Sequence, residues 1–234
     1  MKTKAYFDEF ARKLDALAWN VDTAPWAKWA WGIVEQEVGT AERQVIVDLG
    51  TGTGAGIQTM LRFTSNARFI GVDFSEQMIR RARRKSYPGA VDVRFIVSRL
   101  DRLHLPAKSV DVTVSSGTFH HIKNKCRVVA GIIRMLKPGG KFINIDHFRA
   151  GPRYQKEVNA LRRKNPQLAA ANDEARAAVQ WIYDQDRNHP MEFHTDPYEF
   201  ARMLERSGFI CSTVHVAVQP GYAVVSARKP DTEE

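Results

Sequence analysis

The sequence predicts a three-layer α/β protein, with a mostly parallel sheet, helices on both faces and an antiparallel hairpin at the C-terminal end. Strand-like apolar runs alternate with helix-like segments between residues 45 and 146, which is typical of parallel sheets. A turn with three glycines, residues 50–54, follows the first strand. Two last strand-like runs, 209–218 and 222–228, are separated by Pro220-Gly221 and indicate the hairpin.

The N-terminal region predicts helices. Apolar side chains recur at helical spacing over residues 4–19, and a second helix is expected over 26–38, ending near Gly39. Three tryptophans at 26, 29 and 31 favour core packing over a ligand cage. We expect residues 1–40 to form a helical lid.

Residues 41–150 predict the core of the sheet. Ser75 is a suitable N-cap for one helix, and Pro138-Gly139-Gly140 is expected to end another. The expected strands are 45–49, 68–72, 91–97, 110–115 and 140–146, and the expected helices are 54–63, 75–86 and 125–136.

Residues 148–195 interrupt the alternation. Asn165-Pro166 predicts a helix start, and 167–186 form an alanine-rich helical stretch, so 151–195 is expected to be a helical cap beside the sheet. Asp196 to Glu199 forms a capping box for a helix that runs to about Arg206. We expect one domain over 1–234, which residues 196–234 complete with this helix and the hairpin.

The composition excludes several classes of protein. The two cysteines, Cys126 and Cys211, form no CxxC pair, which excludes a disulfide framework or zinc cluster, and no metal site is expected. No run approaches the ~18 apolar residues of a membrane span. The first residues lack the pattern of a secretory signal. We therefore expect a cytoplasmic protein without membrane association.

Positive charge is concentrated in one part of the chain. The net charge is +9, and residues 41–150 carry 19 basic and 8 acidic side chains. The densest cluster comprises Arg80, Arg81, Arg83, Arg84 and Lys85. A solvated helix face is the favoured interpretation, because no exposed aromatic residues alternate with these charges. Nucleic acid binding stays as the alternative.

The run Val45 to Gly54 indicates a cofactor loop. Its strand, glycine turn and helix start leave backbone exposed to a ligand. Gly50, Gly52 and Ala55, with Asp73 further on, also satisfy a dinucleotide pattern, so an NAD-dependent dehydrogenase remains open, as does a turn without ligand.

Five features in order carry a more specific resemblance. They are residues 48–54, Asp73, Asp101 before Leu105-Pro106, residues 115–122 and the Leu136-Lys137-Pro138-Gly139-Gly140 turn. Over about residues 45–147 the chain resembles the class I, Rossmann-like S-adenosylmethionine-dependent methyltransferases, and within them the small-molecule enzymes with an LKPGG turn. A single methyltransferase domain with S-adenosylmethionine as cofactor is what this resemblance implies.

The resemblance implies roles for particular residues. Asp73 would accept the ribose hydroxyls, Phe74 would pack on the adenine, and Asp48 would attract the ammonium group. Asp101 would accept from the adenine amino group, although Leu100 and Arg102 replace the glycine and alanine that usually flank this acid. The full set of expected cofactor contacts is Asp48, Gly50, Thr51, Gly52, Gly54, Asp73, Phe74, Asp101 and Ser116.

Methyl transfer needs an acceptor held in line, and a base only where the acceptor loses a proton. His121, just past the fourth strand, is the leading candidate for a catalytic base, and His120 and His147 are weaker ones. Tyr6, Tyr154, Tyr183, His194 and Tyr222 are candidates to line the acceptor pocket. A small-molecule acceptor is favoured. An RNA or tRNA methyltransferase and an inactive methyltransferase-like protein stay open, and the sequence leaves the oligomeric state undetermined.

Overall fold

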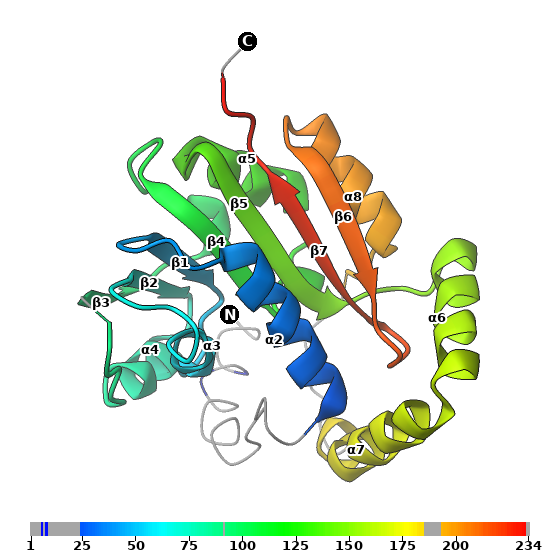
Figure 1. The fold of residues 1–234 in the computed structure, drawn as a ribbon. Helices are drawn as coiled ribbons and strands as arrows, with labels where there is room; N and C mark the ends of the chain where they lie inside the picture. Colours follow the sequence, from blue (N-terminus) through cyan, green and yellow to red (C-terminus); the bar gives the residue numbers. More distant parts are fainter. Residues whose placement is uncertain (1–5, 7, 9–23, 91, 185–192, 233–234) are drawn as a thin grey trace.

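Seven strands form one sheet in the order β3-β2-β1-β4-β5-β7-β6 in the computed structural model, which describes residues 6, 8, 24–90, 92–184 and 193–232. The strands are β1 (Val45–Leu49), β2 (Arg68–Asp73), β3 (Asp92–Val97), β4 (Val110–Ser116), β5 (Leu136–His147), β6 (Ile210–Val216) and β7 (Tyr222–Arg228). The first five are parallel, and β7 pairs antiparallel with both β5 and β6 (Figure 1). The predicted fold class is confirmed.

Helices cover both faces of this sheet. Helices α2 (Pro25–Val38) and α3 (Ala55–Met60) pack with Ile46 and Phe69 on one face. Helices α5 (Lys125–Met135) and α8 (Pro197–Arg206) pack with Val47 and Phe142 on the other. Because both faces are covered, the central strands are apolar on both sides and read as continuous hydrophobic runs.

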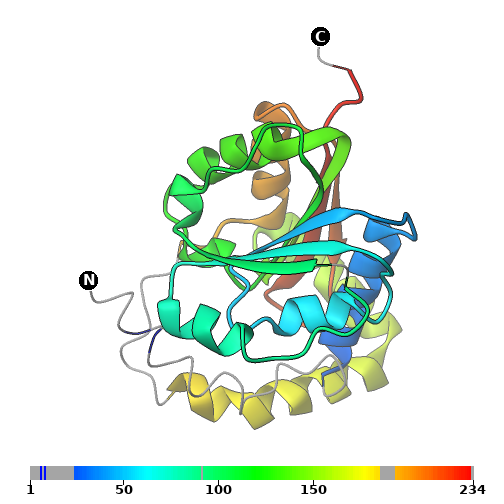
Figure 2. The same cartoon turned by 90° about the vertical axis from the view of Figure 1, so that its left-hand side faces the viewer.

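Two helices follow β5 and lie outside these layers. Helix α6 (Pro152–Lys164) and helix α7 (Pro166–Asp184) occupy the predicted cap, and α7 begins at the proline after Asn165. Figure 1 and Figure 2 show α7 along the base of the molecule, where it contacts α2.

The predicted caps explain where helices begin. The Ser75 hydroxyl accepts from Met78 N at the start of α4 (Glu76–Ala82). The Asp196 carboxylate accepts from Tyr198 N and Glu199 N at the start of α8. Gly208, with φ +97°, follows the end of α8, since glycine adopts this conformation without a Cβ penalty.

Some predicted boundaries are wrong. Helices α3 and α4 are shorter than the predicted 54–63 and 75–86. The predicted turn at 138–140 lies inside β5, which starts directly after α5. The register between β4 and β5 shifts between Val110 and Val112, and this irregularity accommodates Gly139 at φ +72°. The predicted helix 4–19 lies outside the described residues. No helix in the described ranges is long and apolar enough to cross a membrane.

Candidate active site

The glycine loop after β1 is tied to the ends of two strands. Gly50 N and Thr51 N both donate to Val72 O on β2, at 2.8 and 2.9 Å. Gly52 N donates to Asp73 Oδ2 at 3.0 Å, and Gly54 N donates to Thr51 O. The backbone N–H groups of all three glycines are therefore satisfied inside the protein.

Two of these glycines are required by close neighbours. A Cβ on Gly50 would lie 2.1 Å from Thr118 Oγ1, in the loop after β4. A Cβ on Gly54 would lie 2.1 Å from the hydroxyl of Tyr87. Their φ angles are +76° and +84°, in the left-handed region that favours glycine. The loops after β1 and β4 therefore meet, as expected for the carboxyl edge of a parallel sheet.

Asp48 and Asp73 place two buried carboxyl groups at this loop. Thr51 Oγ1 donates to Asp48 Oδ2 at 2.6 Å, and Ser75 N donates to Asp73 Oδ1 at 2.8 Å. Burial, reinforced by the charge of Asp73 and opposed by the Thr51 hydrogen bond, raises the pKa of Asp48 to about 6. Burial also raises the pKa of Asp73 to about 6, against hydrogen bonds from the backbone and with the charge of Asp8 adding to the rise.

Asp8 brings a third carboxyl group to the same place. The Ser75 hydroxyl donates to Asp8 Oδ1, and Gln77 N lies 3.4 Å from the same oxygen. Asp8 therefore lies at the start of α4, beside Asp73, and the lid over residues 1–40 stays a prediction.

The electrostatics of this loop discriminate between cofactors. The three carboxyl groups create a negative potential, which favours a cation. The glycine N–H groups already donate inside the protein, so they do not offer an anion site to a pyrophosphate. S-adenosylmethionine carries an ammonium and a sulfonium, and the residues present fit it. Asp48 contacts the loop through the Thr51 hydroxyl. Asp73 accepts from two backbone N–H groups and keeps further lone pairs for a ligand. The same observation counts against the dehydrogenase alternative.

The remaining expected cofactor residues are Ser116, Phe74 and Asp101. Ser116 is exposed at the end of β4, and Phe74 is half-buried directly after Asp73. Asp101 lies on the short helix η1 (Leu100–Arg102), where Arg99 Nε and Nη2 each donate to one of its oxygens at 3.0 Å. The Arg99 hydrogen bonds hold the pKa of Asp101 below its usual value. Any contact with adenine would share a carboxylate that Arg99 already binds.

A cluster of imidazole rings lies one strand further along this edge. His120 Nδ1 lies 2.5 Å from Asp146 Oδ1, and the His120 backbone N–H donates to the other carboxylate oxygen. The ring of His121 has its centroid 3.8 Å from that of His120. The rings of His147 and His194 lie 5.2 and 5.5 Å from that of His120. Four histidines therefore meet at the ends of β4 and β5.

Aromatic rings close one side of this histidine cluster, which we define as His120, His121, His147 and His194. Tyr222 on β7 lies 4.0 Å from His147 between ring centroids, and Trp26 stacks on Tyr222 at 4.2 Å. Tyr154 is fully buried and donates to Tyr222 O, so it belongs to the core and is not a pocket residue. The side chain of Tyr183 lies outside the described residues.

Sequence reasoning missed the partnership of Asp146 with His120. Asp146 also accepts from His147 N at 2.8 Å. Burial raises the pKa of Asp146, but the charges and hydrogen bonds of His120 and His147 outweigh it and leave that pKa below its usual value. The signal was present, because Asp146 ends one strand and His120 follows its parallel neighbour. Among the described residues, no group of three His, Cys, Asp or Glu side chains is arranged to hold a metal ion.

Comparisons with known proteins agree with this geometry. Residues 46–140 match a family model described as a methyltransferase domain. The chain is 32% identical over 107 residues to phosphoethanolamine N-methyltransferase 1 of Arabidopsis thaliana, covering 46% of this chain but 22% of that protein. It is 24% identical over 216 residues to the ubiquinone/menaquinone biosynthesis C-methyltransferase UbiE of Syntrophotalea carbinolica, covering 88% and 85% of the two chains.

A solved structure shares the fold. The S-adenosylmethionine-dependent methyltransferase of Aquifex aeolicus superposes with a TM-score of 0.64 at 19% identity, over 94% of this chain and 97% of that one. The chain spans less than two thirds of the length of several curated relatives that it matches. The sheet order, the acid-lined glycine loop and the family match agree: residues 46–140 form a methyltransferase domain, and the chain has the class I, Rossmann-like methyltransferase fold.

Proposed function

We propose that this protein transfers the methyl group of S-adenosylmethionine to a small-molecule acceptor that binds at the histidine cluster. One observation carries the proposal: buried Asp48 and Asp73 line a glycine loop whose amides are already bonded, one strand away from the Asp146–His120 pair. A cation site and a proton-accepting site therefore adjoin at one edge of the sheet.

The cofactor side follows from the carboxylates. When bound, S-adenosylmethionine supplies a methyl group that its positive sulfur has already activated. Asp73 would hold the ribose hydroxyls and Asp48 would attract the ammonium, while Gly50, Gly52 and Gly54 let the loop make the tight turn that holds these acids together. Burial is the main cause of both raised pKa values, with repulsion between the acids a smaller one, and a bound cation would favour the charged form of both carboxyl groups.

The acceptor side follows from the rings. His121, His147, His194 and Tyr222 offer polar atoms on flat apolar bodies, which suits a mixed or aromatic acceptor. The acceptors named by the relatives, phosphoethanolamine and quinone precursors, are both small molecules. Holding the acceptor close and in line supplies most of the rate enhancement in such a displacement.

We assign His121 as the base where the acceptor must lose a proton. It lies in the loop that contacts Gly50 through Thr118, and its ring adjoins His120. Replacement His121→Ala is expected to lower turnover while S-adenosylhomocysteine binding stays nearly unchanged. His104→Ala, an exposed histidine on another loop, is the matched control. Full activity of His121→Ala would remove the assignment.

The proposal as a whole is tested by methyl-labelled cofactor. Purified protein is incubated with ¹³C-methyl S-adenosylmethionine and, separately, with pooled small metabolites or with transfer RNA, and labelled products are identified by mass spectrometry. We expect label in a small molecule. Label found only in RNA would replace the proposed acceptor class, and cofactor binding without any transfer would indicate an inactive relative.

A further inference from the structure

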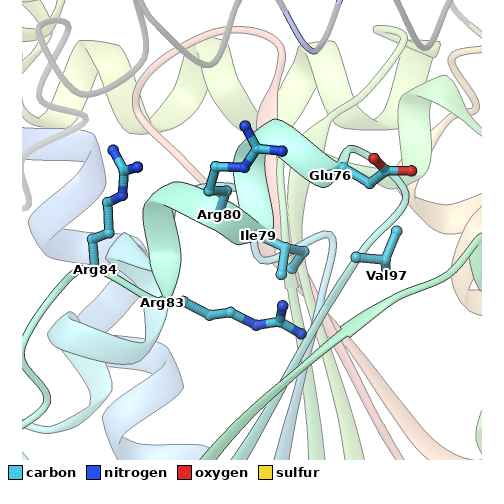
Figure 3. Close-up of a pocket in the computed structure, with 6 residues that line it drawn as sticks. All are labelled: Glu76, Ile79, Arg80, Arg83, Arg84 and Val97. Atoms are coloured by element: carbon cyan, nitrogen blue, oxygen red, sulfur yellow. The ribbon is translucent and has the colours of Figure 1, made fainter.

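A cleft lies beside α4 at the end of β3, and none of the residues that line it belongs to the histidine cluster. It has a volume of about 420 Å³ and is lined by Glu76, Ile79, Arg80, Arg83, Arg84 and Val97. Figure 3 shows Arg80 and Arg83 on either side of Ile79, with Glu76 and Val97 at one end of the cleft and Arg84 at the other. This size is within the usual range for small-molecule sites.

The cleft opens at the free edge of the sheet. β3 comes first in the strand order, so within the described chain it pairs only with β2. Arg83 Nη2 donates to Phe95 O on β3 at 2.9 Å, which fixes one guanidinium at this edge. Val97 is 42% exposed, an apolar side chain left bare beside three cations.

The positive charge in the cleft is not neutralised locally. Two acids at the start of β3 and just after it are engaged elsewhere, because Asp92 pairs with Arg94 and Asp101 pairs with Arg99. Neither Arg80 nor Arg84 has a carboxylate partner among the residues that the structure describes. The cleft therefore holds three guanidinium groups and one carboxylate, Glu76.

This combination selects a particular ligand chemistry. Guanidinium groups bind phosphate through paired hydrogen bonds, and arginine is the preferred residue for that contact. Val97 offers an exposed apolar surface for a flat base, with the buried Ile79 at the floor of the cleft. The Glu76 carboxylate can accept from a sugar hydroxyl or a base amino group. We propose that this cleft binds a phosphorylated nucleotide unit, either free or within an RNA strand. None of the lining residues belongs to the proposed cofactor contacts or to the histidine cluster, so this proposal does not rest on the proposed function.

The test uses the whole protein with S-adenosylhomocysteine present in excess, which occupies the cofactor site, and pyrimidine probes, which avoid its adenine pocket. Uridine diphosphate, uridine and inorganic pyrophosphate are titrated by calorimetry at low salt. A labelled single-stranded 12-mer of uridylate is followed by fluorescence anisotropy over a salt series. These arms distinguish a free nucleotide from RNA as the source of the phosphate.

We expect uridine diphosphate to bind at least tenfold more tightly than uridine or pyrophosphate. Arg80→Glu with Arg84→Glu should weaken that binding at least tenfold, and Arg80→Gln with Arg84→Gln should weaken it less. For the 12-mer, the log–log salt slope should become shallower by about 1.4 in the double variant, at ~0.7 for each phosphate that the protein no longer neutralises.

The matched control reverses the same charges elsewhere. Arg202 and Arg206 are exposed on α8 at the same four-residue spacing, at the opposite end of the sheet. Arg202→Glu with Arg206→Glu should change binding by less than twofold. Binding of the 12-mer alone assigns the site to RNA, and binding of the diphosphate alone assigns it to a free nucleotide. Absence of both, equal loss in the control, or pyrophosphate binding as tightly as the nucleotide would overturn the proposal.

Discussion

His120 and Asp146 are joined at 2.5 Å between Nδ1 and Oδ1, and their side chains are 8% and 2% exposed. The same carboxylate accepts from the backbone N–H groups of His120 and His147. One buried acid on β5 therefore orients a ring and fixes the loop after β4, which carries His121 and Thr118.

Replacing Asp146 with asparagine should destabilise the protein by about 1–3 kcal/mol at pH 7, because one amide oxygen cannot serve three donors in a buried site. The folded pKa of Asp146 lies below 3.8, so its stabilising charge is present above that pH and is lost as the pH falls through the folded value. Urea unfolding should show the difference shrinking below about pH 4. Asp92→Asn, in an exposed pair, is the control and should change stability by ~0.5 kcal/mol or less.

Replacing Asp48 with asparagine should have the opposite effect on stability. The pKa of Asp48 is raised from 3.8 to about 6, so between these values the folded state binds more protons and stability falls as pH rises. Above pH 6 the charged, buried carboxylate costs the folded protein on the order of 3 kcal/mol. Asp48→Asn should therefore unfold at higher urea than the parent at pH 7.5 but not at pH 4, and should bind cofactor more weakly. If Asp48→Asn and the parent protein were equally stable at pH 7.5, burial of the charged Asp48 carboxylate would not destabilise the folded protein as we infer.

Replacing Asp73 with alanine should weaken binding of S-adenosylhomocysteine more than tenfold, because the variant loses both the proposed ribose contact and the anchor for Gly52 N. Calorimetry measures this directly. The control is Asp92→Ala. Asp92 lies at the amino end of β3, whereas the candidate site lies at the carboxyl ends of the parallel strands, and its carboxylate pairs only with Arg94 among the described residues. Unchanged affinity in Asp73→Ala would place the ribose elsewhere.

Replacing Gly50 with alanine should destabilise the protein by about 3 kcal/mol, from a left-handed backbone and from overlap with Thr118. Gly221 has φ +85° with open space around its Cβ position, so Gly221→Ala isolates the backbone cost of about 1 kcal/mol. Thermal unfolding of the two variants compares them. A Gly50→Ala variant no less stable than Gly221→Ala would show that the two loops do not meet closely.

Local chemistry made much of the fold predictable. Ser75 and Asp196 cap the helices they were expected to cap, and the five parallel strands lie where apolar runs predicted them. Predicted boundaries were wrong where long-range packing overrides local preference. Residues 138–140, predicted as a turn, instead form the irregular start of β5. Trp29 and Trp31 pack against the core, as predicted.

The sequence by itself determined the glycine loop and the acids beside it, because the glycines, Asp48 and Asp73 lie within one strand–turn–helix unit and the strand that follows. Their role as cofactor contacts stays a prediction. Only the tertiary structure decided that Asp146 joins His120, that His194 approaches His120, and that three arginines share a cleft with Val97. These contacts join residues 13 to 74 positions apart in the chain. They depend on strand order and register, which are set by burial across the whole sheet.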